Sequence, residues 1–260
     1  MDVRTDPNRN DARSRPLRAL RYLAALAVAL FCLIVALSYA LYWQGLAGVP
    51  AELPRAQRTY SADLRRLYWR AHDGQGEIRL PRLSPPRVVW NVARMLADQD
   101  SMRRPPSAAV QLLTQAARAM SWQLAASSGR APPGHQVELS LGIALSRERQ
   151  GEQLIDYLLE RSYYGQNAGH RSMHGIDAAA SHYYGLPVER LTAAEQVALL
   201  VLPRGPSYFD PACNPERFRQ RYATLLALTG LAPLDAAESA PPPRMRIGAC
   251  ARDALQPQAR

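Results

Sequence analysis

The feature that most constrains this chain is an uncharged, strongly apolar run close to its N-terminus. Residues 22–43 read YLAALAVALFCLIVALSYALYW and contain no charged side chain. As one helix, this run would be about 33 Å long, against a bilayer hydrocarbon core of about 30 Å. Tyr39, Tyr42 and Trp43 lie at its far end, where aromatic rings favour the level of the lipid headgroups. The run therefore predicts a single transmembrane anchor over residues 22–43.

Charge on either side of this run predicts its orientation. Six arginines precede it, namely Arg4, Arg9, Arg13, Arg15, Arg18 and Arg21. Because positively charged flanks stay in the cytoplasm, we expect residues 1–21 to form a cytoplasmic basic tail and the chain after about residue 44 to lie outside. A cleavable signal peptide is the alternative, since Ser38 and Ala40 would make an acceptable cleavage site. The length of the run and the aromatic residues at its end favour an anchor that is not cleaved.

The composition restricts the partners of the chain. Its 260 residues leave room for one domain plus appendages. All 32 basic residues are arginine, and the formal net charge is +10. This charge suits anionic partners such as phospholipid headgroups or a lipid pyrophosphate. The sequence has no zinc-finger pattern, no aromatic-plus-basic repeat and no glycine-rich phosphate loop, so we expect no nucleic-acid partner.

Beyond the anchor, the pattern changes from irregular to helical. Residues 44–88 are rich in proline and arginine and predict a basic juxtamembrane linker, either solvated or lying on anionic lipid. From Val88 onward, apolar residues recur every three to four positions, and no strand alternation stands out. Thr192 and Glu195 form a capping-box pattern before an apolar run that Pro203 ends. We therefore expect a mainly α domain over residues 89–232 and a flexible tail over residues 233–260.

The cysteines leave two interpretations open. Cys32 lies within the apolar run, whereas Cys213 and Cys250 lie far beyond it. If the main domain is outside the cytoplasm, Cys213 and Cys250 could form a disulfide. Two free thiols are the equally weighted alternative.

The segment from Glu152 to Pro215 carries the most specific pattern. Its elements are Tyr157-Leu158, Tyr163-Tyr164-Gly165, Gly175-Ile176-Asp177-Ala178-Ala179, Tyr183-Tyr184-Gly185, Leu191 with Glu195 and Leu199, and Pro203 through Pro211. In order and spacing they resemble the C-terminal half of family 51 glycosyltransferases, the transglycosylase domain of penicillin-binding proteins and their monofunctional relatives. The resemblance implies a mainly α, lysozyme-like helical domain. Glycines, tyrosines and alanines dominate the matches, so the resemblance concerns fold and ancestry more than activity.

The resemblance also implies two essential carboxylates and several basic side chains. The family's first motif, Glu-Asp-x-x-Phe-x-x-His-x-Gly, is reduced here to Asp98-Gln99-x-x-Met102. Asp98 would be a catalytic carboxylate shorter by one methylene than the family's glutamate, and a misplacement of about 1 Å can cost about a hundredfold in rate. A solvated carboxylate on a helix surface is the alternative interpretation of Asp98.

The second motif, Gly-Ser-Thr-Ile-x-x-Gln-Leu-x-Lys-Asn, is also eroded, and its distance from the first is far shorter than in the family. Gln115 stands at the position of the family's glutamine and Arg118 at that of its lysine, while the Ser-Thr pair is missing. The resemblance makes Gln115 and Arg118 candidates for substrate binding. Ordinary residues on a polar helix face are the alternative.

The third motif, Arg-Lys-x-x-Glu, keeps only its carboxylate, Glu138. Leu141, Gly142 and Leu145 follow Glu138 at helical spacing and share its face, a setting in which a carboxylate is either paired or has a raised pKa. Glu138 is therefore the first candidate for a catalytic carboxylate, and a glutamate that complements the helix dipole is the alternative. His135 is a further binding candidate, because its imidazole could be partly protonated and so carry positive charge at the position of the motif's lysine.

Three functions follow from these patterns. The first is a peptidoglycan glycosyltransferase that polymerises lipid II, with catalysis impaired by the eroded motifs. The second is a non-catalytic relative that acts as a scaffold or binding protein of the cell-wall machinery. The third is a lytic transglycosylase that uses Glu138 as its single acid, although no lytic motif surrounds this residue.

The same patterns indicate partners and location. The resemblance implies lipid II or a glycan strand as ligand, cell-wall synthesis proteins as partners and a divalent cation near the pyrophosphate, although the residues themselves suggest no cofactor and no metal site. With the anchor, it places the chain in a bacterial inner membrane as a single-pass protein. The N-terminus would be cytoplasmic and the main domain periplasmic.

Overall fold

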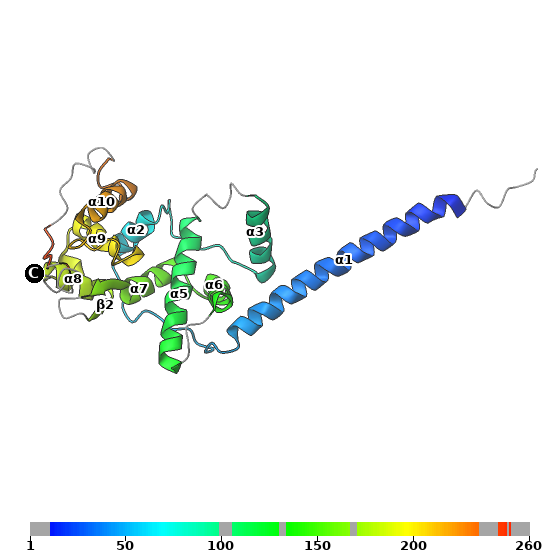
Figure 1. Ribbon diagram of the computed structural model, residues 1–260, viewed down its shortest axis with the longest axis horizontal. Helices are drawn as coiled ribbons and strands as arrows, with labels where there is room; N and C mark the ends of the chain where they lie inside the picture. The colour runs from blue at the N-terminus through cyan, green and yellow to red at the C-terminus, as the bar shows by residue number, and fades with distance from the viewer. Residues whose placement is uncertain are drawn as a thin grey trace, which may run out of the picture.

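The computed structural model describes residues 11–98, 106–129, 134–166, 171–233, 244–248 and 250. This part of the chain is mainly helical, as predicted (Figure 1). A long helix, α1 (Asp11–Leu46), extends away from a helical body. The helices of the body are α2 (Ala62–Ala71), α3 (Pro85–Ala97), α5 (Ala108–Ser128), α6 (His135–Glu148), α7 (Gly151–Arg161), α8 (Ile176–Tyr184), α9 (Ala193–Leu200) and α10 (Pro215–Thr229), with 3-10 turns η2 (Val188–Arg190) and η3 (Leu202–Arg204).

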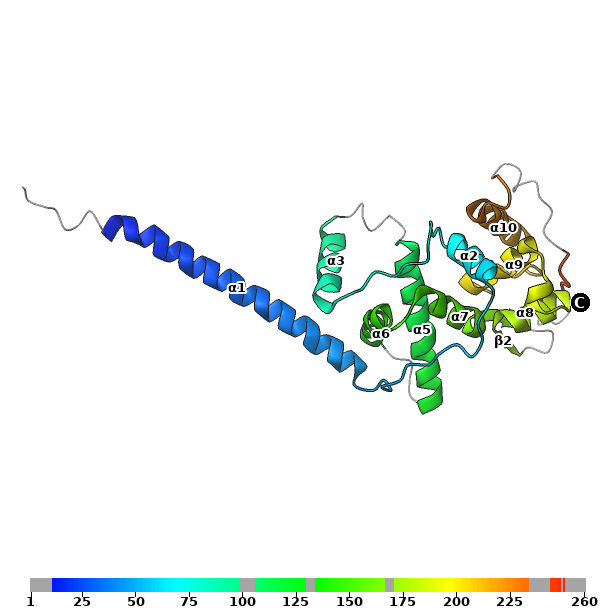
Figure 2. The ribbon, with the colours of Figure 1, turned by 180° about the vertical axis from the view of Figure 1, so that it is seen from behind.

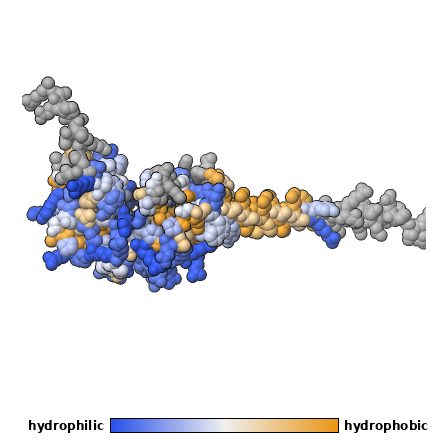
Figure 3. Space-filling model, turned by 90° about the horizontal axis from the view of Figure 1, so that it is seen from below, coloured by the Kyte–Doolittle hydropathy of each residue, from blue (hydrophilic) through white to orange (hydrophobic). Residues whose placement is uncertain are grey.

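The helix α1 is the one described helix that is long and apolar enough to cross a membrane, over Leu20–Leu46. Seen from both sides, its N-terminal part makes no contact with the body (Figures 1 and 2). Its surface is apolar, while the body beside it carries much hydrophilic surface (Figure 3). The helix is longer than the predicted 22–43 span because it begins within the basic tail and continues past the aromatic residues.

The end of α1 is packed against the body. Ser38 and Tyr42 are buried, and Gln136 of α6 donates a hydrogen bond from Nε2 to the carbonyl of Leu41 at 3.0 Å. A Cβ atom at Gly45 would lie 2.2 Å from Oγ of Ser140, so the two helices touch at a point where only glycine fits. The end of helix α1 is thus docked onto α6.

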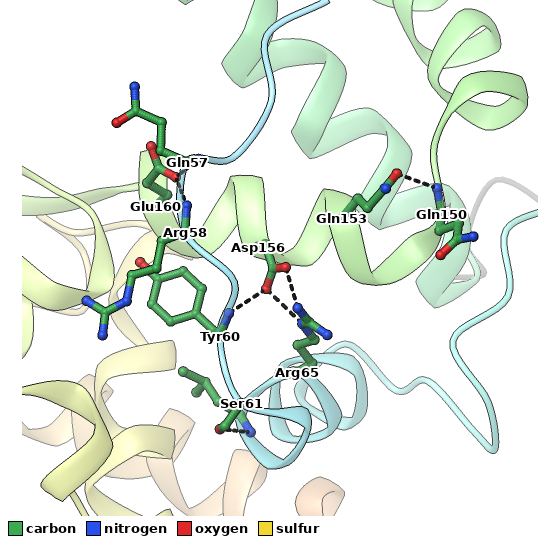
Figure 4. A network of polar contacts seen from close by, with 10 residues as sticks. Gln57, Arg58, Tyr60, Ser61, Arg65, Gln150, Gln153, Asp156 and Glu160 are labelled. Atoms are coloured by element: carbon green, nitrogen blue, oxygen red, sulfur yellow. Dashed lines mark hydrogen bonds and ion pairs between the residues drawn. The ribbon is translucent and has the colours of Figure 1, made fainter.

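The predicted linker over residues 44–88 is corrected by the structure, because α2 lies within it. Leu64, Leu67, Tyr68 and Ala71 of this helix are buried at spacings of three and four residues and join the core. Ser61 caps the helix by accepting a hydrogen bond from the backbone N–H of Leu64 at 3.2 Å. Arginines stand between these apolar positions, so the helical periodicity of the segment is not evident in the sequence. The preceding segment lies along α7 (Figure 4).

The core is centred on the packing of α5 against α6 and α7. Its fully buried side chains include Leu112 and Met120 of α5, Leu141 and Leu145 of α6 and Ile155 of α7. Helix α6 also contacts α1, and α3 contacts α1 as well. Through these contacts α6 links the core to α1, which sets the position of any group on its first turn.

One small sheet interrupts the helical pattern. The strands β1 (Tyr163–Gln166) and β2 (Ser172–His174) form an antiparallel pair. Gly165 and Gly175 adopt positive φ angles there, and a Cβ at Gly175 would lie 2.7 Å from the carbonyl oxygen of Glu160. The local backbone geometry therefore requires glycine at these positions, which is consistent with a structural role for the matched motif.

The tail is held to the body at two points. Cys213 and Cys250 form a disulfide, which decides between the two interpretations of these residues. The backbone N–H of Arg246 donates a hydrogen bond to the carbonyl of Tyr183 at 2.7 Å. The predicted flexible tail at 233–260 falls largely outside the described residues.

Candidate functional site

Glu138 is held in an ion-paired position on the first turn of α6. Its side chain is 14% exposed. Nε of Arg118 lies 3.6 Å from one carboxylate oxygen, and Nδ1 of His135 lies 3.6 Å from the other. A carboxylate is favoured there because the N-terminal end of a helix carries partial positive charge. The packing of α5 against α6 places Arg118 opposite it.

The surroundings of this carboxylate join it to the end of the apolar helix α1. Gln136, two residues before Glu138, donates a hydrogen bond to the carbonyl of Leu41 and lies 3.2 Å from Oε1 of Gln44. Leu139 and Trp122 are each 54% exposed, and Trp122 follows Arg118 by one helical turn. The ion pair is therefore flanked by apolar side chains close to the end of α1.

The structure brings together three of the five predicted site residues, namely Glu138, Arg118 and His135. Gln115 lies on the same helix as Arg118 but faces α2, where its Oε1 accepts a hydrogen bond from the hydroxyl of Tyr68 at 3.1 Å. This contact occupies the acceptor oxygen of Gln115 in packing between helices.

Asp98, the other predicted carboxylate, belongs to a different part of the body and caps α3. It is exposed at the C-terminal end of α3, and its backbone N–H donates to the carbonyl of Arg94. The described partners of Glu138 are Arg118 and His135, and Asp98 is not among them. Gln99 and Met102 of the predicted first motif lie outside the described residues. A catalytic role for Asp98 stays a prediction.

His72, which follows α2, is a half-buried polar residue that sequence reasoning missed. Its ring stacks on Tyr68 at 4.5 Å between centroids, and its Nδ1 lies 2.9 Å from the carbonyl of Tyr68. Burial lowers the pKa of His72, and the nearby charges of Arg221 and Arg204 lower it further. No signal pointed to His72, because its helix lies in the segment that was interpreted as a linker.

This lowered pKa predicts a pH dependence of stability. The ordinary pKa of histidine is about 6.5. Between the folded-state pKa and that value, the unfolded chain binds more protons, so the free energy of unfolding falls as the pH falls. Chemical denaturation of the detergent-solubilised protein at about pH 5 and about pH 7 should show this loss. We expect a smaller change in the free energy of unfolding between these two pH values in His72→Gln. An unchanged difference would contradict the assignment to His72.

A divalent cation does not fit the described site. No three His, Cys, Asp or Glu side chains of the described ranges come together in a way that could hold a metal ion. Glu138 faces Arg118 and His135 rather than a second carboxylate. We therefore derive no step through a metal ion.

Among the residues that the structure describes, Glu138 lines neither of two cavities on the body. One, of about 650 Å³, lies between the end of α2 and the start of α5, with Trp69 and Ala108 in its wall. The other, of about 160 Å³, lies between residues 54–59 and helices α5 and α7. Glu138 instead lies at the surface under Arg118 and His135, and its assignment as a catalytic residue stays a prediction.

Comparisons with known proteins agree with this fold. Residues 109–229 match the family described as Transglycosylase. Penicillin-binding protein 1A of Pseudomonas aeruginosa is 32% identical over 84 residues, which cover 32% of this chain and 10% of that protein. Penicillin-binding protein 1A of Mycobacterium tuberculosis is 36% identical over 89 residues, which cover 34% of this chain and 10% of that protein.

A longer but weaker match is penicillin-binding protein 1A of Neisseria flavescens, which is 29% identical over 138 residues, or 53% of this chain and 16% of that protein. The chain spans from about a tenth to about a third of the length of the curated relatives that it matches. The family match begins after Asp98 and contains Gln115, Arg118, His135 and Glu138. The helical region over residues 109–229, which carries the Glu138 ion pair, is therefore similar to the transglycosylase domain of glycosyltransferase family 51.

Proposed function

We propose that this protein is a membrane-anchored, peptidoglycan glycosyltransferase-like protein that acts on lipid II or glycan strands, with weak catalysis. The observation that carries the proposal is the pairing of Glu138 with Arg118 and His135, on the helix onto which the apolar α1 is docked. The transfer of a lipid-linked sugar needs polar side chains that carry out the chemistry. It also needs a nearby bilayer that holds the lipid of the substrate.

The residues of the ion pair suit the chemistry of glycan polymerisation. An acceptor hydroxyl attacks the anomeric carbon of the donor, its proton passes to Glu138, and the bond to the pyrophosphate breaks with the electron pair leaving on the phosphate oxygen. Arg118 and a protonated His135 would stabilise the departing negative charge. These roles follow from the positions of the three side chains within one group.

Weak catalysis is expected because few cations surround Glu138. Gly134 and His135 stand where the family's third motif has arginine and lysine. In the described part of the chain, Arg118 is the one permanent cation in an ion pair with Glu138. One positioned interaction of this kind is commonly worth about 3 kcal/mol of transition-state stabilisation, so the loss of two should slow the reaction strongly.

An inner-membrane location, with the N-terminus in the cytoplasm and the body in the periplasm, completes the proposal. The docking of Ser38 and Tyr42 onto the body favours an anchor that remains attached. Helix α3, beside α1, exposes Val89, Trp90, Val92, Met95 and Leu96 by 42–65%, which suits contact with a bilayer surface. The disulfide between Cys213 and Cys250 suits an oxidising compartment.

The decisive experiment is a lipid II polymerisation assay on the full chain in detergent. We expect slow formation of glycan chains by the wild type and a loss of about a hundredfold or more in Glu138→Gln, because a positioned base contributes at least this much. Glu148→Gln is the matched control, since Glu148 lies exposed at the other end of α6. Product formation by Glu138→Gln at the wild-type rate would contradict the proposed base.

A non-catalytic binding protein is the second candidate, favoured by the use of Gln115 in helix packing. In this case the wild type and Glu138→Gln would both show background product. Lipid II would still bind the wild type, and Arg118→Gln would weaken this binding, because Arg118 is largely exposed beside Glu138. Undetectable binding to the wild type would exclude this candidate.

A further inference from the structure

The smaller of these two cavities is lined by several positively charged side chains. It has a volume of about 160 Å³ and lies between residues 54–59 and helices α5 and α7. Three arginines, Arg55, Arg58 and Arg149, are among its lining residues. The volume corresponds to about five water molecules at roughly 30 Å³ each, which is enough for a small polar group.

Two of these three arginines have no carboxylate partner among the described residues. Arg58 is paired with Asp177 at 2.9 Å and with Glu189. The one carboxylate in the wall, Asp156, is paired with Arg65. No ion pair is found for Arg55 or Arg149 in the parts of the chain that the structure describes. The cavity therefore holds excess positive charge.

Arg149 lies beside a second positive charge, that of Arg55, in this position. It is partly buried, and its Nη2 donates a hydrogen bond to the carbonyl of Leu53 at 2.7 Å. Burial lowers the pKa of Arg149 and the charge of Arg55 lowers it further, while the charges of Glu148 and Glu52 raise it. A bound anion would place a negative charge beside both Arg55 and Arg149.

Neutral donors complete the wall. Gln153 lies on α7 at the cavity, and its Oε1 accepts the backbone N–H of Gln150 at 3.1 Å (Figure 4). This contact uses the oxygen of the amide and leaves its NH₂ group for another acceptor. Thr59, in the segment before α2, also lines the cavity and carries a hydroxyl. Guanidinium groups with such donors match the oxygens of a phosphate group.

We propose that this cavity is a binding site for a phosphate group, separate from the Glu138 ion pair. The group would come from free phosphate or from a phospholipid headgroup. A headgroup is within reach because Leu53 follows the end of α1 at Leu46 by seven residues, which span at most about 25 Å. This proposal does not depend on the proposed glycosyltransferase activity, because its test measures thermal stability.

The test is thermal unfolding of the full chain with inorganic phosphate and, separately, in nanodiscs with or without phosphatidylglycerol. At ten times the dissociation constant, we expect phosphate to raise the melting temperature by roughly 3 °C or more over sodium chloride of equal ionic strength. Arg55→Gln and Arg149→Gln should each abolish the rise, measured from their own baselines. A rise with phosphatidylglycerol alone identifies a headgroup.

The variants also separate binding from general charge effects. Arg82→Gln removes the same charge at an exposed position outside the cavity and should keep the full rise. Arg149→Gln also loses the hydrogen bond to Leu53, whereas no such contact of Arg55 is found within the described part of the chain. The proposal is overturned if neither phosphate nor phosphatidylglycerol raises the melting temperature, or if Arg55→Gln responds as Arg82→Gln does.

Discussion

Replacement of Asp156 by alanine is expected to lower the free energy of unfolding by about 3–5 kcal/mol, the usual cost of removing one partner from a buried ion pair. The carboxylate accepts hydrogen bonds from Nε and Nη2 of Arg65, at 2.8 and 2.5 Å, and from the backbone N–H of Tyr60 at 3.1 Å (Figure 4). The side chains of Asp156 and Arg65 are only 6% and 17% exposed. The variant would leave a cation and an N–H group without an acceptor.

The effect on the fold follows from the elements that Asp156 joins. It lies on α7, while Arg65 lies on α2 and Tyr60 lies in the segment that connects α2 to the anchor. Without this carboxylate, α2 and the preceding segment would lose their strongest polar attachment to the core. Denaturant unfolding followed by circular dichroism measures the change in free energy.

The matched control is Glu77→Ala. Glu77 accepts two hydrogen bonds from Arg79, as Asp156 does from Arg65, but both side chains of that pair are more than 75% exposed. An exposed pair of this kind contributes at most about 1 kcal/mol. If Asp156→Ala lost no more stability than Glu77→Ala, the buried network would not hold α2 in place.

Loss of the Cys213–Cys250 disulfide is expected to have an effect of similar size. The two cysteines are 37 residues apart in the sequence, and the entropy of closing such a loop in the unfolded chain corresponds to roughly 4 kcal/mol. The bond also keeps the tail near α8, where Arg246 donates its backbone N–H to Tyr183. A reducing agent should therefore lower the melting temperature of the wild type.

A double variant separates this bond from other thiol effects. The variant with Cys213→Ser and Cys250→Ser should melt at the lower temperature with or without the reducing agent. Cys32→Ser changes the remaining cysteine, which is exposed on α1, and should respond to the reducing agent as the wild type does. A wild-type melting temperature that is insensitive to reduction would contradict the expected contribution.

Several local features could be predicted from the sequence because they depend on residues a few positions apart. The capping box at Thr192 is confirmed, with the N–H of Thr192 donating to Glu195 at 2.7 Å and the N–H of Glu195 donating back at 3.3 Å. The apolar periodicity of the body predicted helices that the structure contains. The first-turn position of Glu138 on α6 follows from the same reasoning.

Other features could not be predicted because their partners are distant in the chain. Helix α2 has an apolar stripe, but nearby prolines and arginines made its segment read as a linker. Gln115 stood in a family motif, yet it bonds to Tyr68, which lies 47 residues earlier in the sequence. The excess charge at Arg55 and Arg149 emerges only when residues 54–59 lie against α5 and α7.

The sequence by itself determined an apolar helix of membrane-spanning length, a helical body and kinship with a transglycosylase domain. These depend on periodicity, composition and short motifs, which act over one or two helical turns. Only the tertiary structure decided that Glu138 meets Arg118, that α1 docks on α6 and that Cys213 meets Cys250. Such contacts depend on how whole helices pack, since packing sets the distance between side chains that the chain itself keeps far apart.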